Sequence, residues 1–289
     1  MPLLLLIFKG DCILIKSIKM QMTVLLKRKS TIIMYFFMLF LVLYNFFKNI
    51  ITYYGFDIMR LFHPMKVGIM SDYNAIGFYF TEFYPLLVII PAAFSFLIDR
   101  NSKEFVFIQS RVGKRNYYWG KLISVFLITF LVFTIPLFIE FILNCVAFPL
   151  SATGDPTAAS LYDLGYIDSV RRYFFSSLYI FSPYLYNLFF IIVFGTFSGI
   201  LATFVTAIST FKFMKFRIMI FIPVYMLLYI FTVIGTTFKG ISFSTNYFNY
   251  LRMYNGVNKS GLAYFVFMIT ALDLSFLIMT LKSRRDNLE

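Results

Sequence analysis

Six long apolar segments dominate this chain and limit the folds that it can adopt. Crossing roughly 30 Å of hydrocarbon takes about 20 helical residues. We place the predicted membrane spans at about 31–51, 76–98, 122–149, 184–210, 218–237 and 262–281. Only 13% of the residues are charged, whereas a soluble domain averages about 25%. The sequence therefore predicts an all-α integral membrane protein.

The basic residues predict the orientation of these spans. With both termini on one side, 18 of the 26 Lys and Arg residues fall on that side. Because cytoplasmic loops carry the excess of Lys and Arg, we expect both termini in the cytoplasm and the chain in the cell membrane. The bias towards Phe, Ile, Lys, Tyr and Asn favours a bacterial source. No basic run has the length or aromatic interleaving of a nucleic-acid groove, so we expect no nucleic-acid partner.

Residues 1–30 are expected to form an amphipathic helix in the cytoplasmic membrane interface. Apolar residues recur there at helical spacing, at Leu14, Ile18, Met22 and Leu25. A helix with one apolar and one basic face lies in the plane of the bilayer surface, although a flexible basic tail remains the alternative. We expect these residues to be retained, followed by a transmembrane domain over 31–281 and a cytoplasmic tail over 282–289. A second surface helix is expected in the aromatic half of the loop 150–183.

The chain lacks the motifs of an enzyme. Its closest approach to a phosphate-binding loop begins at Gly113, but six residues rather than four precede Gly120-Lys121, and Leu122 follows. Cys12 and Cys145 are expected on opposite sides of the membrane, so we expect no disulfide. The single histidine, His63, is interpreted as an ordinary loop residue. We therefore expect no catalytic residue, no metal site and no cofactor bound by this chain.

Two acidic residues, Glu140 and Asp273, lie well inside predicted spans. A carboxylate at membrane depth costs on the order of 3 kcal/mol, so it should face protein or water. One hypothesis is a proton or cation relay, and Asp273 is the better candidate because it lies nearer mid-span. The alternative, a carboxyl group hydrogen-bonded to neighbouring helices or at a subunit interface, is favoured because two isolated acids make a poor relay.

Small residues on the fourth span favour close helix packing. Gly195 and Gly199 are four residues apart, a spacing that lets two helix backbones approach each other. We expect this contact to form within the chain, with a contact between subunits as the alternative.

A charged segment, residues 99–121, separates the second span from the third and should face the cytoplasm. An apolar ridge of Phe105, Phe107 and Ile108 is expected on a short helix there, between Glu104, Arg111 and Arg115. Apolar anchors with a charged rim are typical of a surface that docks into a partner. The alternative is a helix that places these aromatic residues in lipid.

Together, the six spans, the internal termini, the N-terminal helix and this segment resemble a type 2 ABC-transporter permease. The residues that carry the resemblance are Asp99-Arg100, the helix Ser102 to Ser110, Arg111 to Arg115, and Tyr118 to Lys121. Asn101-Ser102 stands where the family often has an acidic residue and a glycine. The resemblance implies a coupling helix in this segment and short re-entrant helices within 238–261.

The resemblance also implies the partners: a second permease, identical or related, and a pair of separate ATPase subunits that bind ATP and Mg. Aromatic spans with few charges favour export of an amphipathic or hydrophobic cargo, such as a peptide, a lipid-linked molecule or a drug. A motor-independent immunity or resistance protein that binds a toxic peptide is the alternative. An intramembrane enzyme dependent on Glu140, Asp273 or His63 is the weakest hypothesis.

Overall fold

The computed structural model describes residues 2–56, 58, 61, 63–102, 104–150, 170–211, 213–214, 216–237 and 243–288. Helices account for 79% of the described residues, which contain no β-strand. The predicted all-α fold is therefore confirmed. The segment 151–169 and the start of the loop 238–261 lie outside the described residues.

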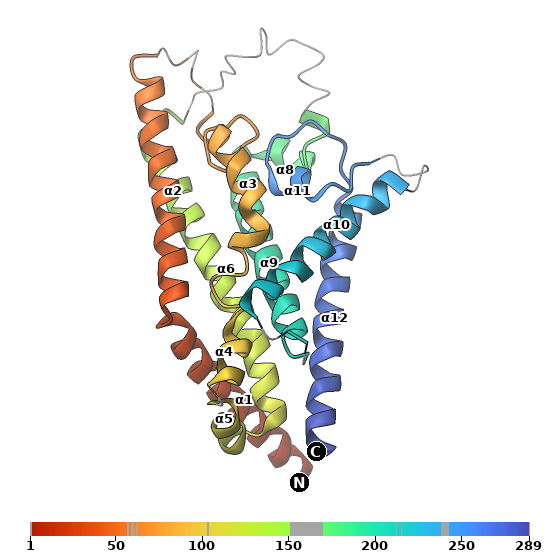
Figure 1. Ribbon diagram of the computed structural model, residues 1–289. Helices are drawn as coiled ribbons and strands as arrows, with labels where there is room; N and C mark the ends of the chain where they lie inside the picture. Colours follow the sequence, from red (N-terminus) through yellow and green to blue (C-terminus); the bar gives the residue numbers. More distant parts are fainter. Residues whose placement is uncertain are drawn as a thin grey trace.

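Among the described residues, five helices (Figure 1) are long and apolar enough to cross a membrane. They are α2 (Lys29–Tyr53), α6 (Lys114–Ala147), α9 (Pro183–Ile208), α10 (Phe221–Thr237, preceded by the 3₁₀ turn η3, Arg217–Ile220) and α12 (Gly261–Leu288). They coincide with the first, third, fourth, fifth and sixth predicted spans. Both chain ends lie at the end of the bundle that holds α5 (Glu104–Val112), and α11 (Tyr247–Leu251) lies at the other. We call these the α5 end and the α11 end.

The second predicted span is not one helix. It divides into α3 (Ala75–Leu87) and α4 (Ser95–Asn101), joined by a series of turns. Pro91 lies in the break, where its missing N–H prevents a continuous helix. The Thr31 hydroxyl of α2 donates to the Pro91 carbonyl (2.6 Å), so a neighbouring helix satisfies one of the backbone groups at the break. The span predicted over 76–98, which contains Pro85 and Pro91, is thus divided in the structure, and a sixth crossing stays a prediction that depends on α3 and α4 together.

Helices α6 and α9 form the centre of the bundle. In the most apolar window of α9, 78% of the residues are buried, against 28% in α10 and in α12. A Cβ atom on Gly199 would lie 2.6 Å from Cδ2 of Phe126 in α6, and one on Gly195 would collide with Thr134. At these two glycines α9 therefore lies close against α6 of the same chain.

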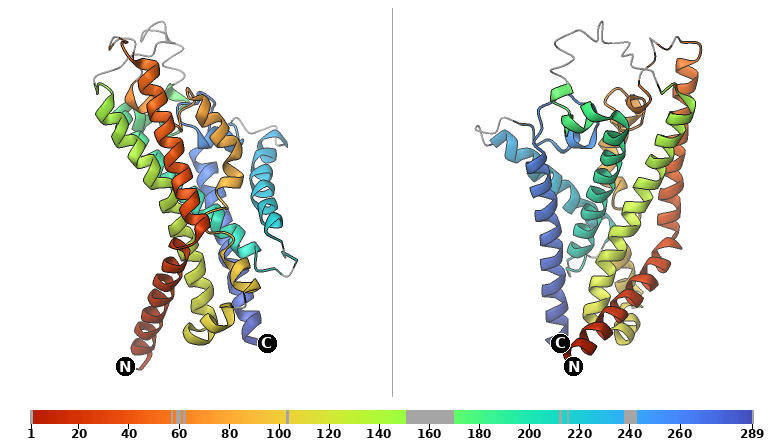
Figure 2. Two further views of the ribbon diagram at one scale, coloured as in Figure 1. Left: turned by 60° about the vertical axis from the view of Figure 1, so that its left-hand side comes forward. Right: turned by 180° about the vertical axis from the view of Figure 1, so that it is seen from behind.

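The N-terminal segment is helical, as α1 (Pro2–Leu26), and packs along the first half of α6 (Figure 2). The Ser17 hydroxyl donates to the Asn116 carbonyl (3.1 Å), and the Gln21 amide donates to the Tyr117 carbonyl (3.0 Å). Leu25 on the same face is fully buried. This face of α1 therefore packs against the chain's own bundle.

Short elements cover the α11 end. They are η2 (Pro64–Lys66), α8 (Ser176–Phe181) and α11. The helix α8 lies within the predicted loop 150–183. Asn246 caps α11 by accepting a hydrogen bond from the Phe248 N–H (3.1 Å). The loop 238–261 thus contains one short helix among its described residues.

Candidate functional site

A buried ion-pair cluster lies at the α5 end, around Asp99 at the C-terminal end of α4. The Asp99 residue is only 2% exposed. One carboxylate oxygen lies 2.6 Å from Nη2 of Arg28, and the other lies 2.5 Å from Nζ of Lys121. The Tyr117 hydroxyl donates to this second oxygen (3.0 Å). The carboxylate is therefore bonded to side chains from two other parts of the chain.

The Asp99 cluster joins three elements that are distant in sequence. Arg28 is the residue before α2, Asp99 belongs to α4, and Lys121 belongs to the first turns of α6. Removing one member of a buried ion pair commonly costs about 3–5 kcal/mol, because the remaining charge stays buried without compensation. The cluster therefore fixes the position of α4 relative to the junction of α1 and α2 and to α6.

The next residue, Arg100, ties α4 to the end of α9. Its guanidinium donates to the carbonyls of Phe211 (3.1 Å) and Met214. These carbonyls follow the C-terminus of α9, where the helix dipole favours a positive charge. Asp99 thus connects α4 to α6, and Arg100 connects α4 to the end of α9.

The helix α5 divides its apolar residues between two faces. Phe105, Ile108 and Val112 recur at helical spacing and pack against a small core that includes Tyr118. Phe107 is 71% exposed, and its neighbour Val106 is 52% exposed. The predicted single ridge of Phe105, Phe107 and Ile108 is therefore wrong, because residue 107 lies roughly opposite residue 105 and about 100° around the helix from residue 108.

Charged residues surround the exposed part of α5. Glu104, Arg111 and Arg115 are all exposed. Arg115 also lines a groove of about 330 Å³ between α6 and α12, together with Trp119 and Arg284. The surface formed by Val106, Phe107, Glu104, Arg111 and Arg115 is called the α5 surface below.

A second polar cluster surrounds Glu140 in the half of α6 nearer the α11 end. Glu140 is 4% exposed. Its Oε1 atom accepts hydrogen bonds from the Asn45 side chain of α2 (2.7 Å) and from the Ile69 N–H (2.8 Å). The Asn45 oxygen in turn accepts from the Asn74 amide (2.6 Å). The Glu140 carboxylate is thus hydrogen-bonded to α2 and to the backbone at Ile69.

The other acid within a predicted span, Asp273, is exposed on α12. It forms no hydrogen bond or ion pair with the described part of the chain. The structure therefore does not bring Asp273 and Glu140 together in one site.

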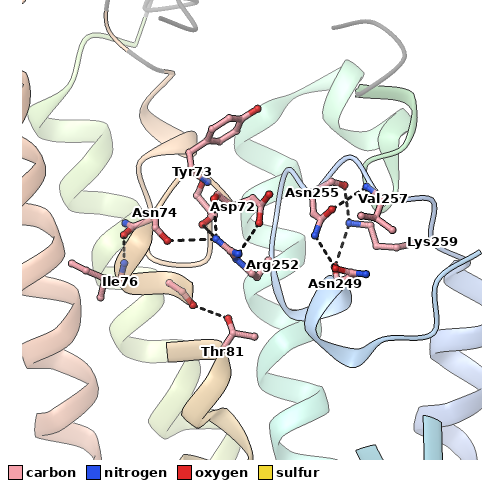
Figure 3. A network of polar contacts seen from close by, with 12 residues as sticks. Asp72, Tyr73, Asn74, Ile76, Thr81, Asn249, Arg252, Asn255, Val257 and Lys259 are labelled. Atoms are coloured by element: carbon pink, nitrogen blue, oxygen red, sulfur yellow. Dashed lines mark hydrogen bonds and ion pairs between the residues drawn. The ribbon is translucent and has the colours of Figure 1, made fainter. Parts of the chain in front are cut away.

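Arg252, which follows α11, fastens the loop before α3 (Figure 3). Its Nη1 atom lies 2.9 Å from the Asp72 carboxylate, and its Nη2 donates to the Asp72 carbonyl (2.8 Å). The Met253 N–H donates to the Met70 carbonyl (2.8 Å), and the Asp72 N–H donates to the Met253 carbonyl (3.0 Å). Sequence reasoning missed this connection, although Arg252 and Asp72 are among the few charges expected on that side.

Two titratable residues of the same end have shifted pKa values. Burial, and then the charge of Lys66, lowers the pKa of His63 to about 4. The His63 Nδ1 atom accepts a hydrogen bond from the Met65 N–H (3.2 Å) at the start of η2. His63 is therefore a neutral capping residue at pH 7.

For Lys259, burial lowers the pKa to about 8, while the charge of Asp72 acts in the opposite direction.

The described residues contain no cluster of three or more His, Cys, Asp or Glu side chains that suits a metal ion. Their strongest polar arrangements are the Asp99 cluster at the α5 end and the Glu140 cluster towards the α11 end. Both clusters join separate helices. They are therefore suited to holding those helices in fixed relative positions, or to passing a displacement from one helix to the next. No family model, no curated protein and no solved structure matches this chain.

Proposed function

We propose that this chain is the permease subunit of an ATP-driven exporter, arranged like the type 2 ABC-transporter permeases, and that the α5 surface docks into a separate ATPase subunit. The observation that carries the proposal is the exposure of Phe107 and Val106 on a short helix between two apolar segments. Large apolar side chains surrounded by charges are the usual anchors of a protein interface.

The residues around α5 support a role in transmitting force. Phe105 and Ile108 attach α5 to the bundle, so a partner bound to its outer face would move the helix as a unit. The ion pair of Asp99 with Lys121 connects the adjoining α4 to α6, and Arg100 connects it to the end of α9. A displacement of α5 would therefore reach both central helices.

The proposal includes partners that supply the energy. A pair of ATPase subunits binds ATP and Mg, and a second permease, identical or related, completes the path across the membrane. The cytoplasmic side would be the α5 end, which carries both termini. The cargo class is amphipathic or hydrophobic.

The proposal is tested by purifying the tagged chain from its native membrane in mild detergent. We expect an ATPase with the phosphate-binding sequence G-x-x-x-x-G-K-[ST] to co-purify with the parent and to be lost from Phe107→Ala. The matched control is Phe216→Ala, because Phe216 is 67% exposed before η3 and lies outside α5. This control should retain the ATPase. Absence of an ATPase from the folded parent would contradict the proposal and favour a motor-independent immunity protein.

A further inference from the structure

An open cleft of about 430 Å³ lies between α3, α10 and α11. Aromatic side chains make up most of its wall: Phe78 from α3, Tyr229 from α10, and Tyr247 and Phe248 from α11. Glu82 of α3 supplies the only charged group among the lining residues that the structure describes. The cleft therefore combines an apolar surface with one negative charge.

The Glu82 carboxylate has no partner in the described part of the chain. Its side chain is exposed, and no hydrogen bond or ion pair joins it to another described residue. Glu82 lies within the second predicted span, where an uncompensated carboxylate is unfavourable. A ligand with a positive charge would remove that cost.

Arg252 contacts two of the four aromatic residues that line the cleft, Phe78 and Phe248. Its guanidinium carbon lies 5.8 Å from the ring centroid of Phe78 and 5.6 Å from that of Phe248, and the two rings meet edge to face at 5.4 Å. The Asp72 carboxylate, 2.9 Å from Arg252, balances the charge of the guanidinium (Figure 3). The rings thus form a prearranged surface, and aromatic faces attract organic cations as well as apolar groups.

We propose that this cleft binds an amphipathic organic cation, with its charged centre at Glu82 and its apolar body against the aromatic rings. The side chains of Thr232 and Asn246 add polar groups at the edge of the cleft. That the bound cation is the cargo rests on the proposed permease function. If so, the cargo class is narrowed to amphipathic compounds with a positive charge. The binding itself requires no ATPase, so it is tested on the purified chain alone.

The probe is tetraphenylphosphonium, and the anion tetraphenylborate, which has nearly the same shape, is its matched control. We expect the folded parent chain to bind the cation and to bind the anion at least about tenfold more weakly, a difference of about 1.4 kcal/mol. Glu82→Gln should weaken binding of the cation at least about tenfold. Tyr229→Leu, which keeps an apolar side chain but removes an aromatic face, should weaken it several-fold.

Asp273→Asn is the control variant, because it removes an equal charge from an exposed position on α12 that does not line the cleft. It should bind the cation as the parent does, and thermal unfolding checks that every variant is folded. The inference is overturned if the folded parent does not bind the cation, if it binds cation and anion equally, or if Glu82→Gln binds the cation as tightly as the parent. Cation binding without any co-purifying ATPase would support the cleft while contradicting the permease function.

Discussion

The Lys121 ammonium lies 2.5 Å from the Asp99 carboxylate, and both side chains are 3% exposed. Arg28 contacts the second oxygen of the same carboxylate. Two cations therefore share one anion at the point where α4 leads into α5. This arrangement links the proposed docking helix to the rest of the bundle.

Removing the shared anion should destabilise the protein strongly. We expect Asp99→Asn to lower the free energy of unfolding by about 3–5 kcal/mol, because Lys121 stays buried without its counter-charge. The double variant Asp99→Asn with Lys121→Met should be more stable than the sum of the two single changes predicts. Thermal unfolding of the four proteins in one detergent measures the coupling, and strictly additive effects would contradict the role given to this pair.

The two intramembrane carboxyl groups should respond differently to replacement by leucine. Glu140→Leu removes the acceptor of the Ile69 N–H, at a cost of about 1–3 kcal/mol for a buried unpaired group, and leaves the Asn45 amide with only its bond to the Val67 carbonyl. Asp273→Leu should leave the thermal stability unchanged or raise it, because that carboxyl has no bonded partner in the described structure. Equal destabilisation by the two changes, measured by thermal unfolding, would show that the Glu140 contacts contribute little.

The lowered pKa of His63 predicts a pH dependence of stability. Since the folded-state pKa is about 4 and the unfolded value about 6.5, the unfolded chain binds more protons between these values. Stability should therefore be complete above pH 6.5 and fall as the pH is lowered towards 4. The difference between the unfolding temperatures at pH 7 and pH 5 should be smaller in His63→Asn than in the parent. The side-chain oxygen of this asparagine can still cap η2. An unchanged pH dependence in this variant would contradict the assignment.

Hydropathy predicted most of the long apolar helices, because a run of apolar residues long enough to cross a bilayer has few other stable folds. The helix contact at Gly195 and Gly199 was also predictable from their spacing. Pro91 predicted a kink in 76–98, but not that the Thr31 hydroxyl of another helix would donate to the Pro91 carbonyl. Sequence patterns do not specify such distant partners.

The candidate site was predicted only in part. The charged segment and the helix within it were identified, but Phe105 and Phe107 were assigned to one face although helical geometry separates them. The contacts of Asp99 with Arg28 and Lys121 were missed, because all three charges flank apolar spans and were used only to orient the chain. Their convergence depends on how α1, α4 and α6 pack, which one sequence does not reveal.

The most direct test of the α5 surface is photo-crosslinking in the living cell. A photoreactive benzoylphenylalanine in place of Phe107 should crosslink to an ATPase subunit, identified by peptide sequencing, whereas the same substitution at Phe216 should not. Crosslinking of position 107 only to lipid, in protein that is inserted and folded, would contradict the docking of α5 and with it the proposed permease function.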